Sequence, residues 1–275
     1  MNAGATLWIV ATPIGNLEDL APRAVAVLRR VAAVACEDTR HARVLMDRYG
    51  VATPLLAYHE HNERELAPKL VARLVAGESL ALVSDAGTPL INDPGFRLVR
   101  AAREHGIAVS TVPGACAAIA ALSIAGLPCE RFAFEGFLPP KPAARRERLV
   151  ALAAEPRTLV FYESKHRIVE SLQDLVDTFG AGRPAALARE LTKVHETVLE
   201  GGLSDLLARV QSDAEQRLGE FVLIVAGAGE AEDEARRREG ERVYALLARE
   251  LPPGKAAKLA AAITGAKRNA LYRAE

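Results

Sequence analysis

The residues best suited to chemistry lie in one stretch, SDAGTPLINDPG, at positions 84–95. Its two glycines allow a ligand to approach the backbone closely, and its two prolines stiffen the chain. Asp85 and Asp93 add hydrogen-bond acceptors and negative charge. A tight turn with aspartate caps would explain part of this composition. A loop this long is more often functional, so the stretch predicts a ligand-binding loop.

The flanking residues indicate where this loop lies in the fold. The short apolar run 80–83 before it is typical of a buried parallel strand. The apolar residues in 96–102 after it recur at helical spacing. The loop therefore connects a strand to a helix, which is the position where open parallel sheets bind ligands.

Polar residues also follow two other predicted strands. Glu37, Asp38 and Arg40 come after the run 31–36, and His59 comes after the run 54–58. At the carboxyl ends of strands they would face the same crevice. Each residue taken alone also fits a helix start, with Asp38 or Thr39 as the capping side chain.

A metal site is not favoured by the sequence. His59 and His61 are two residues apart, which does not match the H-E-x-x-H spacing, and no other histidine or cysteine lies nearby. A polar loop that contacts substrate, or a solvated helix start, explains them better. We expect no metal.

The composition describes a neutral globular protein. Of 275 residues, 50% are hydrophobic, and 35 Lys and Arg balance 35 Asp and Glu. A strongly basic nucleic-acid binder is therefore not indicated, although local basic patches would serve that function. The three scattered cysteines suit a reducing cytosol better than a disulfide framework. The N-terminal residues lack the pattern of a signal peptide and no apolar run reaches the length of a membrane span, so we expect a cytoplasmic protein with no membrane partner.

The first half of the chain predicts five strand–helix units in about 125 residues, as in a doubly wound, mainly parallel α/β domain. We place this domain at 1–127. The dinucleotide pattern G-x-G-x-x-G and the P-loop pattern G-x-x-x-x-G-K-[ST] are both absent, which argues against a nicotinamide cofactor and against P-loop phosphoryl transfer.

The second half predicts a second α/β domain at 128–227. Two of its predicted strands, 185–189 and 196–200, are separated by only a short polar turn, which indicates a hairpin and hence a mixed sheet. Residues 228–275 then form a charged linker and a small helical tail. The tail carries a basic set that fits either a nucleic-acid contact or a solvated helix surface: Lys255, Lys258, Lys267 and Arg268.

Several of these motifs together resemble one family. The chain is similar to the family of ribosomal RNA small-subunit methyltransferase I, in the tetrapyrrole-methylase superfamily of class III methyltransferases. The resemblance covers nearly the whole chain, and its motifs occur in the same order: VATPIGNL (10–17), EDTR (37–40), the 84–95 loop, PGACAA (113–118), EGFLP (135–139), FYES (161–164) and ARELTK (188–193).

The resemblance implies a homodimer of two-domain α/β subunits that binds S-adenosylmethionine between the domains. It implies methylation of the ribose 2′-hydroxyl of a cytidine in 16S rRNA of the small ribosomal subunit. It also implies a cofactor-binding set: Pro13, Asp85, Ala86, Gly87, Pro89, Asn92, Ala115, Leu138, Tyr162 and Leu191.

The remaining roles are less determined by sequence. A ribose hydroxyl needs a proton acceptor or stabilisation of the alkoxide, and four polar residues are candidates: Glu37, Asp38, His59 and Lys193. Four further cations are candidates for phosphate contacts: Arg40, Arg145, Arg146 and Lys165. Two rival functions remain at this point, namely a methyltransferase acting on a tetrapyrrole or other small acceptor, and a non-catalytic RNA-binding protein of ribosome assembly.

Overall fold

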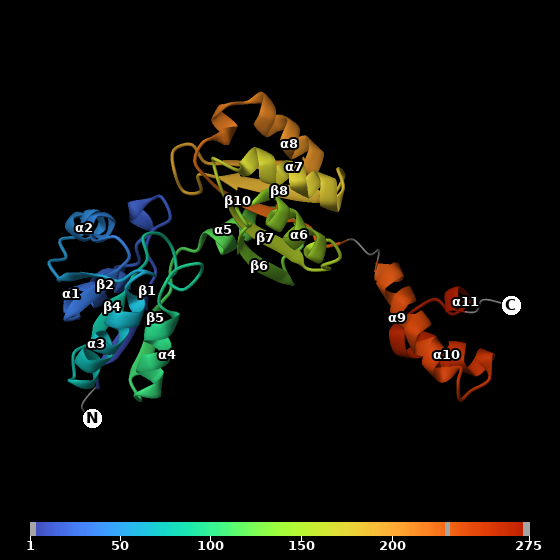
Figure 1. Ribbon diagram of the computed structural model, residues 1–275, viewed down its shortest axis with the longest axis horizontal. Coiled ribbons are helices and arrows are strands. Elements are labelled where there is room, and N and C mark those ends of the chain that lie inside the picture. Colours follow the sequence, from blue (N-terminus) through green and yellow to red (C-terminus); the bar gives the residue numbers. More distant parts are fainter. Residues whose placement is uncertain (1–3, 229–231, 272–275) are drawn as a thin grey trace.

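The computed structural model describes residues 4–228 and 232–271, which form two sheet-based domains and a group of C-terminal helices (Figure 1). The elements of the first domain are β1 (Thr6–Val10), η1 (Leu17–Asp19), α1 (Pro22–Arg30), β2 (Ala33–Cys36), α2 (Thr39–Arg48), β3 (Leu55–Ala57), α3 (Glu63–Val75), β4 (Leu80–Leu82), α4 (Phe96–Glu104) and β5 (Ala108–Val112). Helix α5 (Ala117–Ile124) follows them.

The first sheet is parallel throughout, in the order β3-β2-β4-β1-β5. Its strands are short and rich in Val, Ala and Leu because both faces are covered. Val34 and Cys36 of β2 pack with α1 and α2, whereas Ala33 and Ala35 pack with α3 and α4. This confirms the predicted doubly wound parallel arrangement and brings the loops after β1, β2, β4 and β5 to one edge.

Helix α5 leaves this domain and covers the second sheet. Its residues Ala118, Ala121 and Leu122 pack against Val160, Ala186 and other residues of the second sheet. The chain therefore crosses between the domains directly after β5, in the segment that holds Pro113 and Gly114. The start of α5 consequently lies beside the loops of the first sheet and against the second sheet at once.

The second domain contains β6 (Phe132–Phe137), α6 (Pro142–Leu152), β7 (Thr158–Ser164), α7 (Ile168–Phe179), β8 (Pro184–Arg189), β9 (Thr197–Gly202), α8 (Leu203–Ser212), η2 (Glu215–Arg217) and β10 (Glu220–Val225). Its sheet has the order β6-β7-β10-β8-β9. Only β6 and β7 run parallel, and β8 and β9 form an antiparallel hairpin. The predicted mixed sheet is thereby confirmed.

The core of this domain encloses a buried ion pair. Arg145 of α6 is 2% exposed, and its Nε lies 2.6 Å from Oδ2 of Asp174 on α7. Arg145 also reaches Glu170 at 3.4 Å. The prediction that Arg145 contacts RNA phosphates is therefore wrong, because its guanidinium holds α6 to α7 inside the protein. The neighbouring Arg146 is 55% exposed and remains accessible.

The C-terminal region is a separate helical group, α9 (Glu232–Leu247), α10 (Pro253–Thr264) and α11 (Arg268–Leu271). The helices pack on one another through small residues, including Ala260 and Ala266, and stand apart from both sheets in Figure 1. Lys255 and Lys258 of α10 point outward. No helix of the described residues is long and apolar enough to cross a membrane.

Candidate active site

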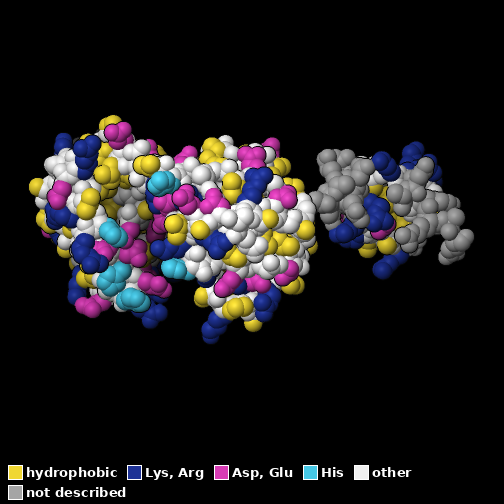
Figure 2. Space-filling model, turned by 90° about the horizontal axis from the view of Figure 1, so that it is seen from above, with side chains coloured by type: hydrophobic (Ala, Val, Ile, Leu, Met, Phe, Trp, Pro, Cys, Tyr) yellow, Lys and Arg dark blue, Asp and Glu magenta, His cyan; other side chains and the backbone are white. Residues whose placement is uncertain are grey.

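A pocket of about 580 Å³ lies between the two domains. The first domain contributes the loop after β4 and Ile14 after β1, and the start of α5 forms part of the wall. The second domain contributes the ends of β6 and β7, the β8–β9 loop and the start of β10. Figure 2 shows carboxylate and histidine side chains gathered where the two lobes meet.

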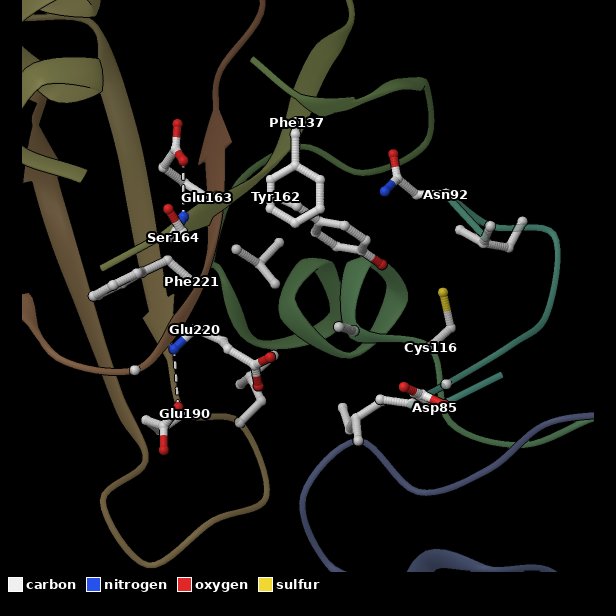
Figure 3. Close-up of a pocket in the computed structure, with 18 of the residues that line it drawn as sticks. Asp85, Asn92, Cys116, Phe137, Tyr162, Glu163, Ser164, Glu190, Glu220 and Phe221 are labelled. Carbon is white, nitrogen blue, oxygen red and sulfur yellow. Dashed lines mark hydrogen bonds between the residues drawn. The ribbon is translucent and has the colours of Figure 1, made fainter. Parts of the chain in front are cut away.

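The lining combines carboxylates with aromatic rings. Asp85 lies on one side of the pocket, and Glu190 and Glu220 lie on the other (Figure 3). Phe137 stacks edge-on against Tyr162, with ring centroids 5.7 Å apart. A pocket of this kind offers acceptors to a cationic ligand and apolar surface to a flat one.

Backbone strain is concentrated in the loops that line the pocket. Among the described residues, four non-glycine residues have positive φ: Leu90 at 74°, Asn92 at 64°, Glu190 at 50° and Thr192 at 67°. The first two lie in the β4–α4 loop and the others in the β8–β9 loop. Such conformations cost free energy and persist where the surrounding structure holds them, often at functional sites.

The β4–α4 loop is fixed to the end of β1. The backbone N–H of Thr12 donates to the carbonyl of Gly87 at 2.8 Å, and that of Gly87 donates back at 3.1 Å. The Thr12 hydroxyl donates to the carbonyl of Ser84 at 3.1 Å. Gly87 has φ +84°, and a Cβ there would lie 3.3 Å from a methyl carbon of Ile14. The positive φ of Gly87 therefore favours glycine, and a side chain there would also crowd Ile14.

Two further contacts join the domains beside the pocket. The hydroxyl of Tyr162 accepts a hydrogen bond from the backbone N–H of Ala118 at 3.2 Å. Gly15 lies directly against the β8–β9 loop, where a Cβ would come within 2.9 Å of the Leu191 carbonyl oxygen and 2.5 Å of Lys193 Cγ. The domain contact thus depends on a missing side chain at position 15.

Gly15→Val is expected to force the β1–η1 loop away from the β8–β9 loop and to lower the activity of the pocket by roughly 100-fold, because displacements of about 1 Å can have that effect. Steady-state kinetics with the substrates of the pocket tests this. Gly182→Val is the matched control, since no atom lies within 4 Å of a Cβ there. Equal activity of the two variants would show that the Gly15 contact does not position the pocket.

Asp85 connects the β4–α4 loop to the start of α2 at the pocket edge. Its Oδ1 accepts the backbone N–H of Asp38 at 3.0 Å, and its Oδ2 lies 3.1 Å from Nδ1 of His41. Polar groups at the carboxyl ends of β2 and β4 therefore lie together. Asp38 itself caps α2 and binds Arg40, whose hydrogen bonds hold the pKa of Asp38 far below its ordinary value.

Asp93 is the pocket carboxyl with the most perturbed proton affinity. Burial, and then the charge of Glu37, raise its pKa to about 6, while a hydrogen bond with Ser84 opposes the shift. The pKa of Glu37 is also raised, first by burial and then by the charge of Asp85. Asp93 is thus poised to exchange a proton near neutral pH.

Lys193 provides the opposite charge at the far wall. Its Nζ lies 2.9 Å from Glu190 Oε1 and 2.8 Å from Glu220 Oε2. Burial lowers the pKa of Lys193, but the hydrogen bonds to Glu220 and Glu190 outweigh it, so the pKa lies above its ordinary value. Lys193 is therefore a fixed cation rather than a proton acceptor.

Comparisons with known proteins identify the family. Residues 6–207 match the family model of the Tetrapyrrole (Corrin/Porphyrin) Methylases, and residues 234–274 match that of the RsmI C-terminal HTH domain. The chain belongs to the tetrapyrrole methylase family. Over 272 residues it is 61% identical to ribosomal RNA small subunit methyltransferase I of Xylella fastidiosa, covering 99% of both chains. The enzyme of the same name from Escherichia coli O157:H7 is 53% identical, covering 99% of this chain and 95% of that protein.

Solved structures share the fold of this tetrapyrrole methylase at low identity. Uroporphyrin-III-C-methyltransferase from Thermus thermophilus aligns with a TM-score of 0.58 and 23% identity, over 82% of this chain and 95% of that chain. Diphthine synthase aligns with a TM-score of 0.58 and 13% identity, over 81% and 90%. These likenesses establish the two-domain fold.

The pocket of this tetrapyrrole methylase contains part of the predicted cofactor set. Six of the ten residues line it: Asp85, Ala86, Gly87, Asn92, Tyr162 and Leu191. Four lie outside the lining: Pro13, Pro89, Ala115 and Leu138. Pro13, Pro89 and Leu138 are buried, and the carbonyl of Ala115 accepts a hydrogen bond from the Thr88 hydroxyl at 2.9 Å. Ala115 thereby contacts the pocket wall, because Thr88 lines the pocket.

Of the other predicted site residues, some line the pocket and some do not. Lys193 and Lys165 line the pocket, whereas Glu37, Asp38 and His59 lie outside the lining. Arg40 is exposed, with 87% of its side-chain surface accessible. Within the described residues, no group of three or more His, Cys, Asp or Glu side chains is arranged to hold a metal ion.

Sequence reasoning did not select several lining residues of this tetrapyrrole methylase. Cys116 and Phe137 lie within the motifs 113–118 and 135–139. Only the conformation of each segment in the structure shows that these two residues line the pocket. Glu220 and Phe221 carry no motif. They reach the pocket because β10 lies between β7 and β8, a strand order that the sequence does not reveal.

Proposed function

We propose that this protein transfers the methyl group of S-adenosylmethionine to the ribose 2′-hydroxyl of a cytidine in 16S rRNA of the small ribosomal subunit. The observation that carries the proposal is the acidic, aromatic pocket between the domains, in a chain 61% identical over its length to a relative named as a ribosomal RNA small subunit methyltransferase.

The pocket residues suit S-adenosylmethionine. Its volume of about 580 Å³ lies in the range of small-molecule sites. Asp85 and Glu190 offer carboxylates to a ligand with a sulfonium and an ammonium group, and Phe137 and Tyr162 offer rings to an adenine. Ala86 and Gly87 leave the backbone open to close approach. When bound, the cofactor supplies a methyl group attached to a positively charged sulfur.

The protein must then align the acceptor hydroxyl, exclude water and take up its proton. We assign the proton to a carboxylate oxygen of Asp93, because this residue lines the pocket and its pKa of about 6 leaves it ionised at neutral pH. We assign to Lys193, a cation of the pocket lining, the stabilisation of the negative charge that develops on the ribose oxygen.

The other predicted proton acceptors fit less well. Asp38 is held as a weak base by Arg40, and neither it nor His59 lines the pocket. Glu37 acts through its charge, which raises the proton affinity of Asp93. This leaves Asp93 as the residue that contacts substrate and Glu37 as a residue that tunes it.

RNA phosphates are proposed to contact exposed cations of the two domains and of the tail. In the two domains these are Arg40, Arg146 and Lys165, and on the tail Lys255, Lys258, Lys267 and Arg268. The match of residues 234–274 to a helix-turn-helix domain model supports the tail as part of this contact. A ribosomal substrate supports a cytoplasmic location. The homodimer stays a prediction, which light scattering would test.

Lys255→Glu combined with Lys258→Glu is expected to weaken binding to small subunits by about tenfold and to reduce its salt dependence, because two phosphate contacts are lost. Filter binding at several salt concentrations measures both quantities. Arg48→Glu, on exposed helix α2, is the control. Unchanged binding by the tail variant would remove the tail from the RNA interface.

Tritiated S-adenosylmethionine with small ribosomal subunits from a strain lacking this gene tests the function. Label in 16S rRNA is expected. Label on a porphyrin precursor instead would support a small acceptor. Cofactor binding by calorimetry separates both from an RNA-binding protein without catalysis, which would give no heat.

A further inference from the structure

Helix α4 exposes an aromatic ring beside the pocket. Phe96, its first residue, is 66% exposed, although Leu98 and Ala102 on the same helix are fully buried. A single exposed apolar residue needs no explanation by itself. The arginines around this one, and its place in the chain, make it informative.

Arginines surround Phe96 on the same surface. Phe96, Arg100 and Arg103 are spaced four and three residues apart, so they share one face of α4. Arg97, the residue after Phe96, adds a further positive charge. Arg64 lies at the start of α3, which packs along α4. These five residues are here called the α3–α4 face.

Two ion pairs hold part of this face in place. Arg97 Nε lies 2.7 Å from Glu63 Oε1, and Arg100 Nε lies 2.8 Å from Glu104 Oε1. The side chains of Arg97 and Arg100 nevertheless remain 51% and 68% exposed. Together with Phe96 they border a surface hollow of about 560 Å³.

The charge of the α3–α4 face is positive in a protein that is neutral as a whole. Four arginines (64, 97, 100 and 103) stand against Glu63 and Glu104, an excess of two positive charges. Within the described residues, Arg64 and Arg103 make no side-chain hydrogen bond or ion pair that would neutralise them. A polyanion is therefore the complementary partner.

The face adjoins the pocket. Asp93 lines the pocket, and Phe96 follows it by three residues, at most about 11 Å along the chain. Gly95, with φ +133°, makes the turn between them, and its missing Cβ gives room to Leu82 and Leu90. A strand with one nucleotide at the pocket would thus have its neighbouring nucleotide within reach of Phe96.

We propose that the α3–α4 face binds single-stranded RNA next to the methylated nucleotide, with one base stacked on Phe96 and phosphates on its arginines. Aromatic stacking and guanidinium contacts are the usual means of holding unpaired RNA. The inference rests on the proposed function, since it assigns a binding surface to that RNA substrate.

Substitutions at Phe96 distinguish stacking by an aromatic ring from contact by any large apolar side chain. Phe96→Leu and Phe96→Ala are expected to lower affinity for a fluorescein-labelled single-stranded RNA dodecamer by about tenfold, whereas Phe96→Tyr stays within about twofold, because only an aromatic ring stacks. Single-turnover methylation of small subunits at low subunit concentration should fall in parallel. Val44→Ala, on exposed α2, is the matched control.

Charge substitutions test the phosphate contacts. Arg100→Glu with Arg103→Glu should reduce the slope of log affinity against log salt by about 0.7 for each phosphate lost. Arg209→Glu, at an exposed position of α8, should leave this slope unchanged. Calorimetry with S-adenosylmethionine should give wild-type affinity for every variant, because the α3–α4 face lies outside the cofactor pocket.

Three results would overturn the proposal. The first is wild-type RNA affinity in Phe96→Leu. The second is equal loss in Phe96→Tyr and Phe96→Ala. The third is a change of molecular mass by light scattering in Phe96→Ala, which would make the face a contact between two copies of the chain. If instead the wild-type protein fails to methylate subunits, the proposed function fails, and RNA binding by the dodecamer assay still decides this inference.

Discussion

Replacing Asp93 by asparagine is expected to lower the rate of methyl transfer to small ribosomal subunits by about 100-fold or more, the contribution typical of a positioned proton acceptor. Asparagine keeps the size of the side chain but cannot take up the ribose proton. Because burial and the charge of Glu37 raise the pKa of Asp93 to about 6, the wild-type rate should fall as the pH drops below that value.

The pH profile distinguishes a catalytic role of Asp93 from a structural one. The wild-type profile, with both substrates below saturation, should show an acidic limb near pH 6, and Asp93→Asn should lack it. Bound S-adenosylmethionine is cationic and favours the ionised carboxylate, so under saturating cofactor the limb should move to lower pH. Asp177→Asn, an exposed carboxylate on α7, is the control. An acidic limb that persists in Asp93→Asn would assign the proton to another group.

Asp174→Ala is expected to destabilise the protein by roughly 3 kcal/mol, because it leaves the buried guanidinium of Arg145 with only the 3.4 Å contact to Glu170. For a chain of this size, that corresponds to a fall in Tm of about 6–12 °C. Differential scanning calorimetry measures the change.

Two variants make this result specific. Asp177→Ala lies on the exposed side of the same helix and should change Tm by no more than about 1 °C. The paired change Arg145→Met with Asp174→Leu removes both charges and should recover most of the lost stability, since apolar pairs of similar volume replace buried ion pairs well. A wild-type Tm in Asp174→Ala would show that Arg145 does not need its partner.

The burial of Arg145 could not be predicted from the sequence. Arg145 and Arg146 are adjacent on an amphipathic helix, and sequence alone treats both as surface cations. In the structure the helix is rotated so that Arg145 faces Asp174, 29 positions later in the chain. Only the packing of α6 on α7 determines which of the two is accessible.

The pocket was predictable to the extent that its residues lie in local motifs. The loop 84–95 follows a buried strand, and the topology of parallel sheets alone places it at the ligand edge. The opposite wall could not be predicted in this way. Glu220 and Phe221 belong to β10, and they reach the pocket because β10 lies between β7 and β8. The strand order of a mixed sheet depends on long-range packing, and no local pattern encodes it.

The crossing of α5 is a similar case. The small residues after β5, in the motif 113–118, suit a close approach of helix and sheet, and such an approach occurs. The sheet is that of the second domain, where Ala118 and Ala121 pack against Val160 and Ala186. The small residues can be read from the local sequence, whereas the sheet against which α5 packs depends on the whole fold.

The most direct test of the account is to locate the transferred methyl group. Small subunits labelled by the purified protein would be deproteinised, and their 16S rRNA hydrolysed in alkali. A 2′-O-methyl group blocks cleavage at its own nucleotide, so the account predicts label in a single alkali-resistant dinucleotide that contains methylated cytidine, identified by mass spectrometry. Label in alkali-released mononucleotides would place the methyl group on a base and contradict the account.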